Sequence, residues 1–200
     1  MSNVKKTPKW IEQVPNALTV IRLVMVPFLV WLMLAYPDRT MPQMWGAFVL
    51  FTAAAFTDKF DGDIARKYNI VSNFGKIADP IADKALVLPA LVIIVWNMWG
   101  RLNTFIVILS FVCVLLIVLR ELGISVWRMV LVRRGKVVPA SPGGKVKTVT
   151  QMAFIGFSLI PWNTFLSSGV VIVIEYILVA LLVIATYLAL ASAKDYVFAR

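Results

Sequence analysis

Long apolar runs, broken by proline, glycine and clusters of charge, dominate the pattern of this sequence. A helix that crosses a membrane needs about 20 mostly apolar residues. Six runs have about that length, and they lie near residues 15–36, 44–67, 74–98, 103–133, 146–165 and 169–194. The pattern therefore predicts an all-α integral membrane protein with six transmembrane helices.

A more polar segment precedes the first run. In residues 1–13, three lysines are interleaved with apolar side chains, which favours a short N-terminal interfacial helix, that is, an amphipathic arm. The segment does not resemble a signal peptide, because no small-residue cleavage site follows a short apolar core. The sequence contains no internal repeat and no linker. We therefore expect residues 1–200 to form a single membrane domain.

The composition agrees with a membrane protein and narrows the possible chemistry. Hydrophobic residues make up 60% of the chain and charged residues 15%, whereas soluble domains have roughly 45–50% and about 25%. There is no histidine, and Cys113 is the single cysteine. Histidine-based acid–base catalysis, intramolecular disulfides and cysteine- or histidine-ligated metal sites are thereby excluded. Proton transfer and metal binding must rely on carboxylates.

The net charge of +10 comes from basic residues that gather on one side of the predicted topology. In a membrane protein, such residues more often face anionic lipid than nucleic acid. The basic residues on this side are Lys5, Lys6, Lys9, Arg66, Lys67, Lys76, Arg128, Arg133, Arg134, Lys136, Lys145, Lys147, Lys194 and Arg200. The opposite side has only Arg39 and Arg101. By the positive-inside rule, we expect both termini on the cytoplasmic side of the cell membrane.

Four aspartates in the second and third runs are the main candidates for a functional site. An ionised side chain at the bilayer centre costs at least about 2.5–3.5 kcal/mol, so these residues need a compensating role. At about 100° per residue, Asp58 and Asp61 lie about 60° apart on one helix. Asp79 and Asp83 stack at positions i and i+4 on the next. Four facing carboxylates repel one another unless metal ions lie between them.

Oxygen ligands of this kind select Mg²⁺ or Mn²⁺, and four carboxylates can hold two such ions for phosphoryl chemistry. Gly62, Ala65 and Gly75 allow helices and a ligand to approach closely. Arg66, one turn beyond Gly62, can hold a phosphate. The competing interpretation is a set of polar residues that line a channel or stabilise helix packing.

The stretch from Asp58 to Asp83 resembles the signature of the CDP-alcohol phosphatidyltransferase family. It matches D-x2-D-G-x2-A-R-x8-G-x3-D-x3-D at all eight fixed positions across 26 residues. The resemblance implies a six-helix membrane enzyme, usually a homodimer, with a site open to the cytoplasmic leaflet. Such enzymes use a hydroxyl acceptor to displace CMP from a CDP-linked lipid or alcohol.

The same resemblance implies roles for individual residues. Asp58, Asp61 and Asp79 are expected to be metal ligands, and Asp83 is expected to be both a ligand and the catalytic base. The residues expected to bind the CDP-lipid are Asn16, Ala17, Leu18, Thr19, Gly62, Ala65, Arg66, Ser72 and Gly75.

Three further segments resemble one subfamily, the bacterial enzymes that transfer a phosphatidyl group from CDP-diacylglycerol to glycerol 3-phosphate. The segments are Pro15–Thr19 with Arg22 and Pro27, Arg120–Glu121 with Arg128, and Gly144–Thr148 with Gln151. The last run adds nothing specific to this resemblance. The expected products are phosphatidylglycerophosphate and CMP, on the route to phosphatidylglycerol.

The later basic residues suit a phosphorylated acceptor. A cluster of cations beside a metal site would hold a dianionic phosphate, which a neutral acceptor would not need. The residues expected to bind it are Arg120, Arg128, Lys145 and Lys147. An arginine inside a membrane is costly without a partner, and Glu121 is the neighbour that can supply one.

Other functions stay open at this point. Within the family, the acceptor could be phosphatidylglycerol, as in a cardiolipin synthase, or it could be serine or inositol phosphate. In other classes, the chain could be a cation transporter whose aspartates line a pathway, or an inactive membrane scaffold. The complete motif argues against a scaffold.

Overall fold

The computed structural model describes residues 9–35, 41–68, 73–133 and 142–197. These residues form six long α-helices and one short 3₁₀ helix, without a strand. The elements are α1 (Lys9–Leu34), α2 (Met41–Tyr68), α3 (Asn73–Trp96), α4 (Thr104–Arg133), α5 (Pro142–Leu159), η1 (Trp162–Thr164) and α6 (Ser168–Val197). The predicted all-α class is confirmed, and each predicted apolar run corresponds to one long helix.

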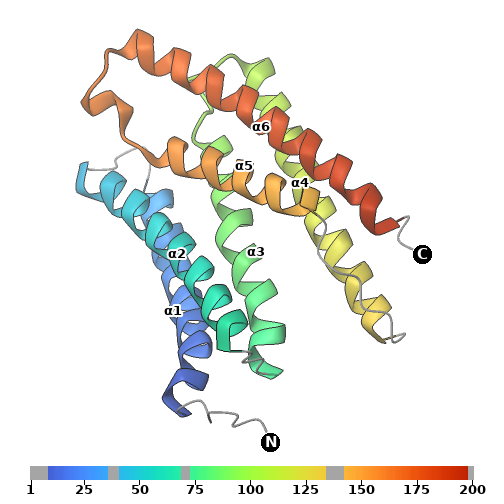
Figure 1. Ribbon diagram of the computed structural model, residues 1–200. Coiled ribbons are helices and arrows are strands. Elements are labelled where there is room, and N and C mark those ends of the chain that lie inside the picture. Colours follow the sequence, from blue (N-terminus) through green and yellow to red (C-terminus); the bar gives the residue numbers. More distant parts are fainter. Residues whose placement is uncertain (1–8, 36–40, 69–72, 134–141, 198–200) are drawn as a thin grey trace, which may run out of the picture.

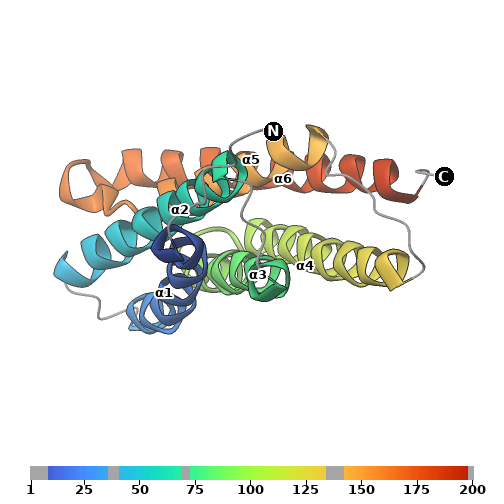
Figure 2. The ribbon, with the colours of Figure 1, turned by 60° about the horizontal axis from the view of Figure 1, so that its bottom comes forward.

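The helices are arranged in two layers (Figures 1 and 2). In Figure 2, α2, α5 and α6 lie above α1, α3 and α4. Helix α1 packs against α2 and α3, and α6 packs against α4 and α5. Helix α3 is central, because it also contacts α4 and α5 (Figure 1).

Apolar side chains form both the interior and much of the outer surface. Leu29, Leu91 and Phe154 are buried in the core. Trp96, Phe105 and Tyr187 are more than 60% exposed. Exposed large apolar side chains in such number suit a surface that faces lipid rather than water. Together with the helical fold, this surface makes the chain a membrane protein.

Three of the helices contain a stretch that is long and apolar enough to cross a membrane. These stretches are Asn16–Leu34 in α1, Thr104–Leu131 in α4 and Ser168–Lys194 in α6. The other three long helices carry the charged motif or the lysines of α5. Six membrane crossings therefore stay a prediction.

Two boundaries differ from the prediction. Lys9–Gln13 were expected in a separate interfacial arm, but they form the first turns of α1 without a break; residues 1–8 lie outside the described residues. Helix α5 ends at Leu159, before the predicted end of its run, because Pro161 lacks the amide hydrogen that a continuing helix needs.

The connection between α3 and α4 is a tight turn. Gly100 has a φ of 79°, a left-handed conformation that glycine adopts readily. The side chain of Asn103 then accepts a hydrogen bond of 2.9 Å from the backbone nitrogen of Phe105, which caps the first turn of α4. This turn places Arg101 over the end of the bundle that lies away from the aspartate motif.

Candidate functional site

The aspartates of the motif lie on two helix segments at one end of the bundle. Asp58 and Asp61 are in the last part of α2, and Asp79 and Asp83 are in the first part of α3, which contacts α2. At a rise of 1.5 Å per residue, Asp61 and Asp79 are each about 10 Å from the adjacent helix ends, and Asp58 and Asp83 about 15 Å. The backbone thus carries the two pairs at matching depths, as a shared site requires.

Asp83 has a half-buried side chain, directly after the fully buried Ala82. The other predicted positions of the motif have side chains outside the described residues, and their roles stay predictions. They are Asp58, Asp61, Gly62, Ala65, Arg66, Ser72, Gly75 and Asp79. Among the side chains that are described, no group of three carboxylates, histidines or cysteines could hold a metal.

Helix α1 contributes a buried polar face next to α2 and α3. Thr19 and Arg22 are fully buried, Asn16 and Leu18 are half-buried, and Ala17 is exposed. Thr19 and Arg22 are three residues apart and therefore share a face. The sequence predicted a site at residues 16–19 and assigned no role to Arg22, although its position inside an apolar run was a signal that it serves a site.

Arg120 is buried between α4 and the end of α6. Its Nε donates a hydrogen bond of 3.0 Å to the carbonyl oxygen of Ala189, and its Nη2 donates one of 2.9 Å to Oγ of Ser192. Its Nη1 donates to Oε1 of Glu121 over 3.0 Å. The predicted partnership with Glu121 is therefore confirmed. The contacts to α6 were not predicted, and they give the last run a structural role in holding Arg120.

Helix α5 brings a second buried cation to the same place. Nζ of Lys147 forms an ion pair with Oε1 of Glu121, the atom that also accepts from Arg120. One turn further, Gln151 is 3% exposed, and its Nε2 has no hydrogen-bond partner among the described residues. A buried amide of this kind is costly unless a ligand or water satisfies it.

The four residues predicted to bind the acceptor phosphate differ in their burial and contacts. Arg120 and Lys147 converge on Glu121, whereas the side chain of Lys145 is exposed. The side chain of Arg128 lies outside the described residues. Because α3 contacts both α4 and α5, the helix that carries Asp83 adjoins the two helices that carry the buried cations.

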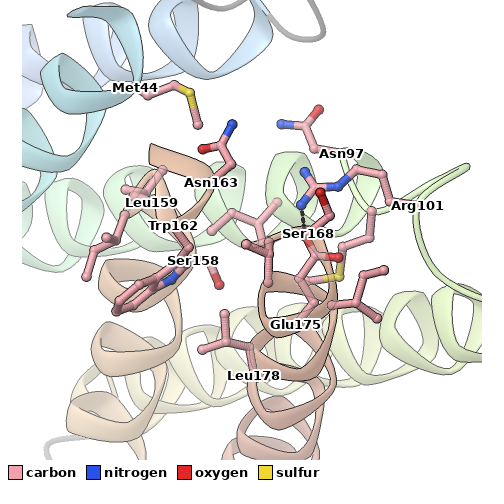
Figure 3. Close-up of a pocket in the computed structure, with 15 residues that line it drawn as sticks. Met44, Asn97, Arg101, Ser158, Leu159, Trp162, Asn163, Ser168, Glu175 and Leu178 are labelled. Carbon is pink, nitrogen blue, oxygen red and sulfur yellow. Dashed lines mark ion pairs between the residues drawn. The ribbon is translucent and has the colours of Figure 1, made fainter. Parts of the chain in front are cut away.

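A cavity of about 450 Å³ lies at the opposite end of the bundle (Figure 3). Its walls come from the first turn of α2, the last turn of α3, the end of α5 and the beginning of α6. Inside it, Arg101 forms an ion pair with the buried Glu175 of α6. The motif occupies the other ends of α2 and α3, so this cavity is separate from the predicted catalytic site. The sequence prediction missed Glu175, although a lone carboxylate in an apolar run was visible.

Comparison with known proteins identifies the family. The model of the CDP-alcohol phosphatidyltransferase family matches residues 12–191. A Mycobacterium tuberculosis protein named "Probable phosphatidylglycerophosphate synthase" is 40% identical over 164 residues, which cover 82% of this chain and 73% of that protein.

Two other relatives bear the name "CDP-diacylglycerol--glycerol-3-phosphate 3-phosphatidyltransferase". The Bacillus subtilis protein is 37% identical over 156 residues, covering 73% of this chain and 76% of its own. The Shigella flexneri protein is 33% identical over 194 residues, covering 93% of both. The chain described here therefore belongs to the CDP-alcohol phosphatidyltransferase family, and it is a membrane-embedded phosphatidyltransferase.

Proposed function

We propose that this enzyme transfers the phosphatidyl group of CDP-diacylglycerol to glycerol 3-phosphate, releasing phosphatidylglycerophosphate and CMP. Two relatives that this chain matches over most of its length carry the name of that activity. We also propose that the whole chain forms a single membrane domain.

The main support for glycerol 3-phosphate as the acceptor is the burial of two cations on helices that contact α3, the helix of Asp79 and Asp83. Arg120 and Lys147 are both less than 10% exposed and meet at one carboxylate oxygen. Two buried cations that share one carboxylate oxygen can both donate to a dianionic phosphate. A neutral acceptor such as serine or inositol would not offer such a group.

The aspartates suit divalent metal ions. Asp58, Asp61, Asp79 and Asp83 present only hard oxygen donors, at matching depths on two contacting helices, and this chemistry favours Mg²⁺ or Mn²⁺. When bound, the ions would offset the negative charge that grows on the diphosphate as CMP leaves.

The residues of the chain have distinct roles in the proposed displacement. Asn16, Thr19 and Arg66 would hold the CDP-lipid, and Arg120 with Lys147 would hold the phosphate of the acceptor. Asp83 would take the proton from the primary hydroxyl of glycerol 3-phosphate. The resulting oxygen attacks the phosphorus that bears the diacylglycerol, a new phosphorus–oxygen bond forms, and the bond to CMP breaks.

The orientation follows from the distribution of basic residues. The beginning of α1, the end of α2 and the beginning of α3 lie at one end of the molecule (Figure 1), and basic residues lie in or next to these helix ends in the sequence. The positive-inside rule then favours a cytoplasmic active site and cytoplasmic termini in a cell-membrane enzyme with six crossings. A homodimer is the assembly that the family resemblance implies.

An acceptor assay tests the proposal. The purified full-length protein is given CDP-diacylglycerol with Mg²⁺ or Mn²⁺ and, separately, glycerol 3-phosphate, phosphatidylglycerol, serine and inositol phosphate. We expect CMP release with glycerol 3-phosphate to exceed that with serine or phosphatidylglycerol by at least about 100-fold, because neither offers a dianionic phosphate to the buried cations. It should also exceed that with inositol phosphate, which carries the same phosphate on a larger acceptor. Preferential use of another acceptor would overturn the assignment. Cation flux into liposomes without CMP release would favour a transporter.

A further inference from the structure

Glu121 lies between the two buried cations of the proposed acceptor site. Its Oε1 accepts a hydrogen bond from Nη1 of Arg120 and forms an ion pair with Nζ of Lys147. Arg120 and Glu121 belong to α4, whereas Lys147 belongs to α5. A single carboxylate oxygen therefore joins the two helices at the point where we expect the phosphate of the acceptor.

Arg120 does not depend on Glu121 for its position. Two other nitrogens of its guanidinium are held by α6, through the carbonyl oxygen of Ala189 at 3.0 Å and Oγ of Ser192 at 2.9 Å. Ser192 is itself fixed, because its hydroxyl donates to the same carbonyl oxygen over 2.9 Å. The guanidinium would thus keep its place if the carboxylate of Glu121 moved aside.

A phosphate would use the same donors that Glu121 uses. Carboxylate and phosphate both accept charge-assisted hydrogen bonds from arginine and lysine, and a phosphate brings more oxygens and up to two negative charges. Glu121 balances only one of the two positive charges that it contacts. The side chain is therefore a weaker ligand for the same two cations than the phosphate that would replace it.

We propose that Glu121 is a built-in counter-anion of the acceptor site: it occupies Arg120 and Lys147 in the empty enzyme and releases them to the phosphate of the acceptor. The identity of that acceptor rests on the proposed function. By competing with phosphate, Glu121 lowers the affinity of the site for anions. It also favours release of the product, which still carries the phosphate of the acceptor.

The E121Q variant separates this role from simple anchoring. Glutamine keeps the size of the side chain and an oxygen that can accept from Arg120, but it removes the negative charge. If Glu121 competes with phosphate, the variant binds phosphate more tightly. If Glu121 only anchors Arg120 and Lys147, the variant binds phosphate equally well or less well.

The experiment is a calorimetric titration of the purified full-length protein in detergent micelles with inorganic phosphate. We expect E121Q to lower the Kd for phosphate by about 3- to 10-fold, the effect of removing one nearby negative charge from a partly screened site. The KM for glycerol 3-phosphate should fall in parallel, and kcat should fall because product release slows. E175Q is the matched control, since it removes a carboxylate at the other end of the bundle, and its phosphate affinity should equal that of the wild type.

An unchanged or weaker phosphate affinity of E121Q would overturn the inference. If E121Q does not fold, E121D serves instead, because its shorter side chain keeps the charge but cannot reach Arg120 and Lys147 as well. E121D should also bind phosphate more tightly than the wild type, and weaker binding would count against the inference. Failure of the proposed function has a different signature. In that case the wild type does not use glycerol 3-phosphate, while phosphate still binds more tightly to E121Q.

Discussion

Two clusters of buried charge lie in different parts of this molecule, and they are built differently. In the cavity of Figure 3, Arg101 pairs with Glu175. About midway along α4, Arg120 shares Glu121 with Lys147 of α5. In the described contacts, the first cluster has one cation for one carboxylate, and the second has two cations for one carboxylate.

The difference indicates different purposes. The side chain of Arg101 is 41% exposed, so this cation is only partly desolvated and depends less on its partner Glu175. The side chains of Arg120 and Lys147 are 5% and 9% exposed, and two such buried cations that share one carboxylate oxygen, the unbalanced cluster, favour a further anionic ligand. A balanced pair suits a structural contact between α6 and the turn after α3. An unbalanced cluster suits an anion site.

The largest effect should come from the motif that adjoins the unbalanced cluster. Asp61→Asn keeps the size of the side chain but removes one negative charge from the proposed metal site. We expect the rate of CMP release to fall by at least about 100-fold, because metal-assisted charge stabilisation is lost. The rate is measured with saturating CDP-diacylglycerol and glycerol 3-phosphate. A rate within about threefold of wild type would contradict the metal assignment, since such a loss is far below that of a catalytic ligand.

The next largest effect should come from the unbalanced cluster itself. Arg120→Ala removes a charged hydrogen bond worth about 1.5–3 kcal/mol, so the KM for glycerol 3-phosphate should rise by about 10- to 150-fold. The KM for CDP-diacylglycerol should change by less than about threefold, as expected for a residue that contacts only the acceptor.

The matched control for this variant is Arg120→Lys, which should recover only part of the affinity because an ammonium lacks the planar donor pair of a guanidinium. Both variants must retain wild-type nucleotide binding, which shows that they are folded. If Arg120→Ala weakens CDP-diacylglycerol and spares the acceptor, the cluster belongs to the donor instead.

The helices could be predicted from the sequence because each apolar run ends at charge, proline or glycine. The partnership of Arg120 with Glu121 could also be predicted, since a buried arginine needs a nearby anion. The hydrogen bonds between Arg120 and α6 could not be predicted. One of their two acceptors is the backbone carbonyl of Ala189, and every residue type has such a carbonyl. The continuity of α1 through Lys9 was hidden by lysines that also suit an interfacial arm.

A smaller effect on activity should follow when one of the hydrogen bonds between α6 and Arg120 is removed. Ser192→Ala removes one hydrogen bond to Arg120 and leaves the bond to the carbonyl of Ala189. We expect the KM for glycerol 3-phosphate to rise by about 2- to 10-fold, in keeping with one hydrogen bond, while kcat changes little. Ser192→Thr keeps the hydroxyl and should restore the KM. If the threonine variant is as impaired as the alanine variant, Ser192 acts through packing rather than by positioning Arg120.

The smallest effect on activity should come from the balanced pair. Glu175→Gln breaks an ion pair whose arginine is partly exposed, so we expect the thermal midpoint to fall by about 2–4 °C, the shift that about 1 kcal/mol gives in a protein of this size. The kcat and both KM values should stay within about twofold of wild type, because the pair lies at the end of the bundle away from the motif. Thermal unfolding in micelles and the CMP assay measure the two quantities. If Glu175→Gln selectively raised the KM for glycerol 3-phosphate, the Arg101–Glu175 pair would also affect acceptor binding, and the two clusters would not differ in function.

Phosphate recognition by the unbalanced cluster is best measured by the ratio of kcat/KM for glycerol 3-phosphate to that for glycerol, because the two acceptors differ only in the phosphate. We expect a high ratio for the wild-type enzyme, the same ratio for Glu175→Gln, and a ratio at least about tenfold lower for Arg120→Ala, as the loss of a charged hydrogen bond requires. An unchanged ratio in Arg120→Ala, or an equal fall in Glu175→Gln, would contradict the claim that the buried cluster of α4, α5 and α6 binds the phosphate of the acceptor.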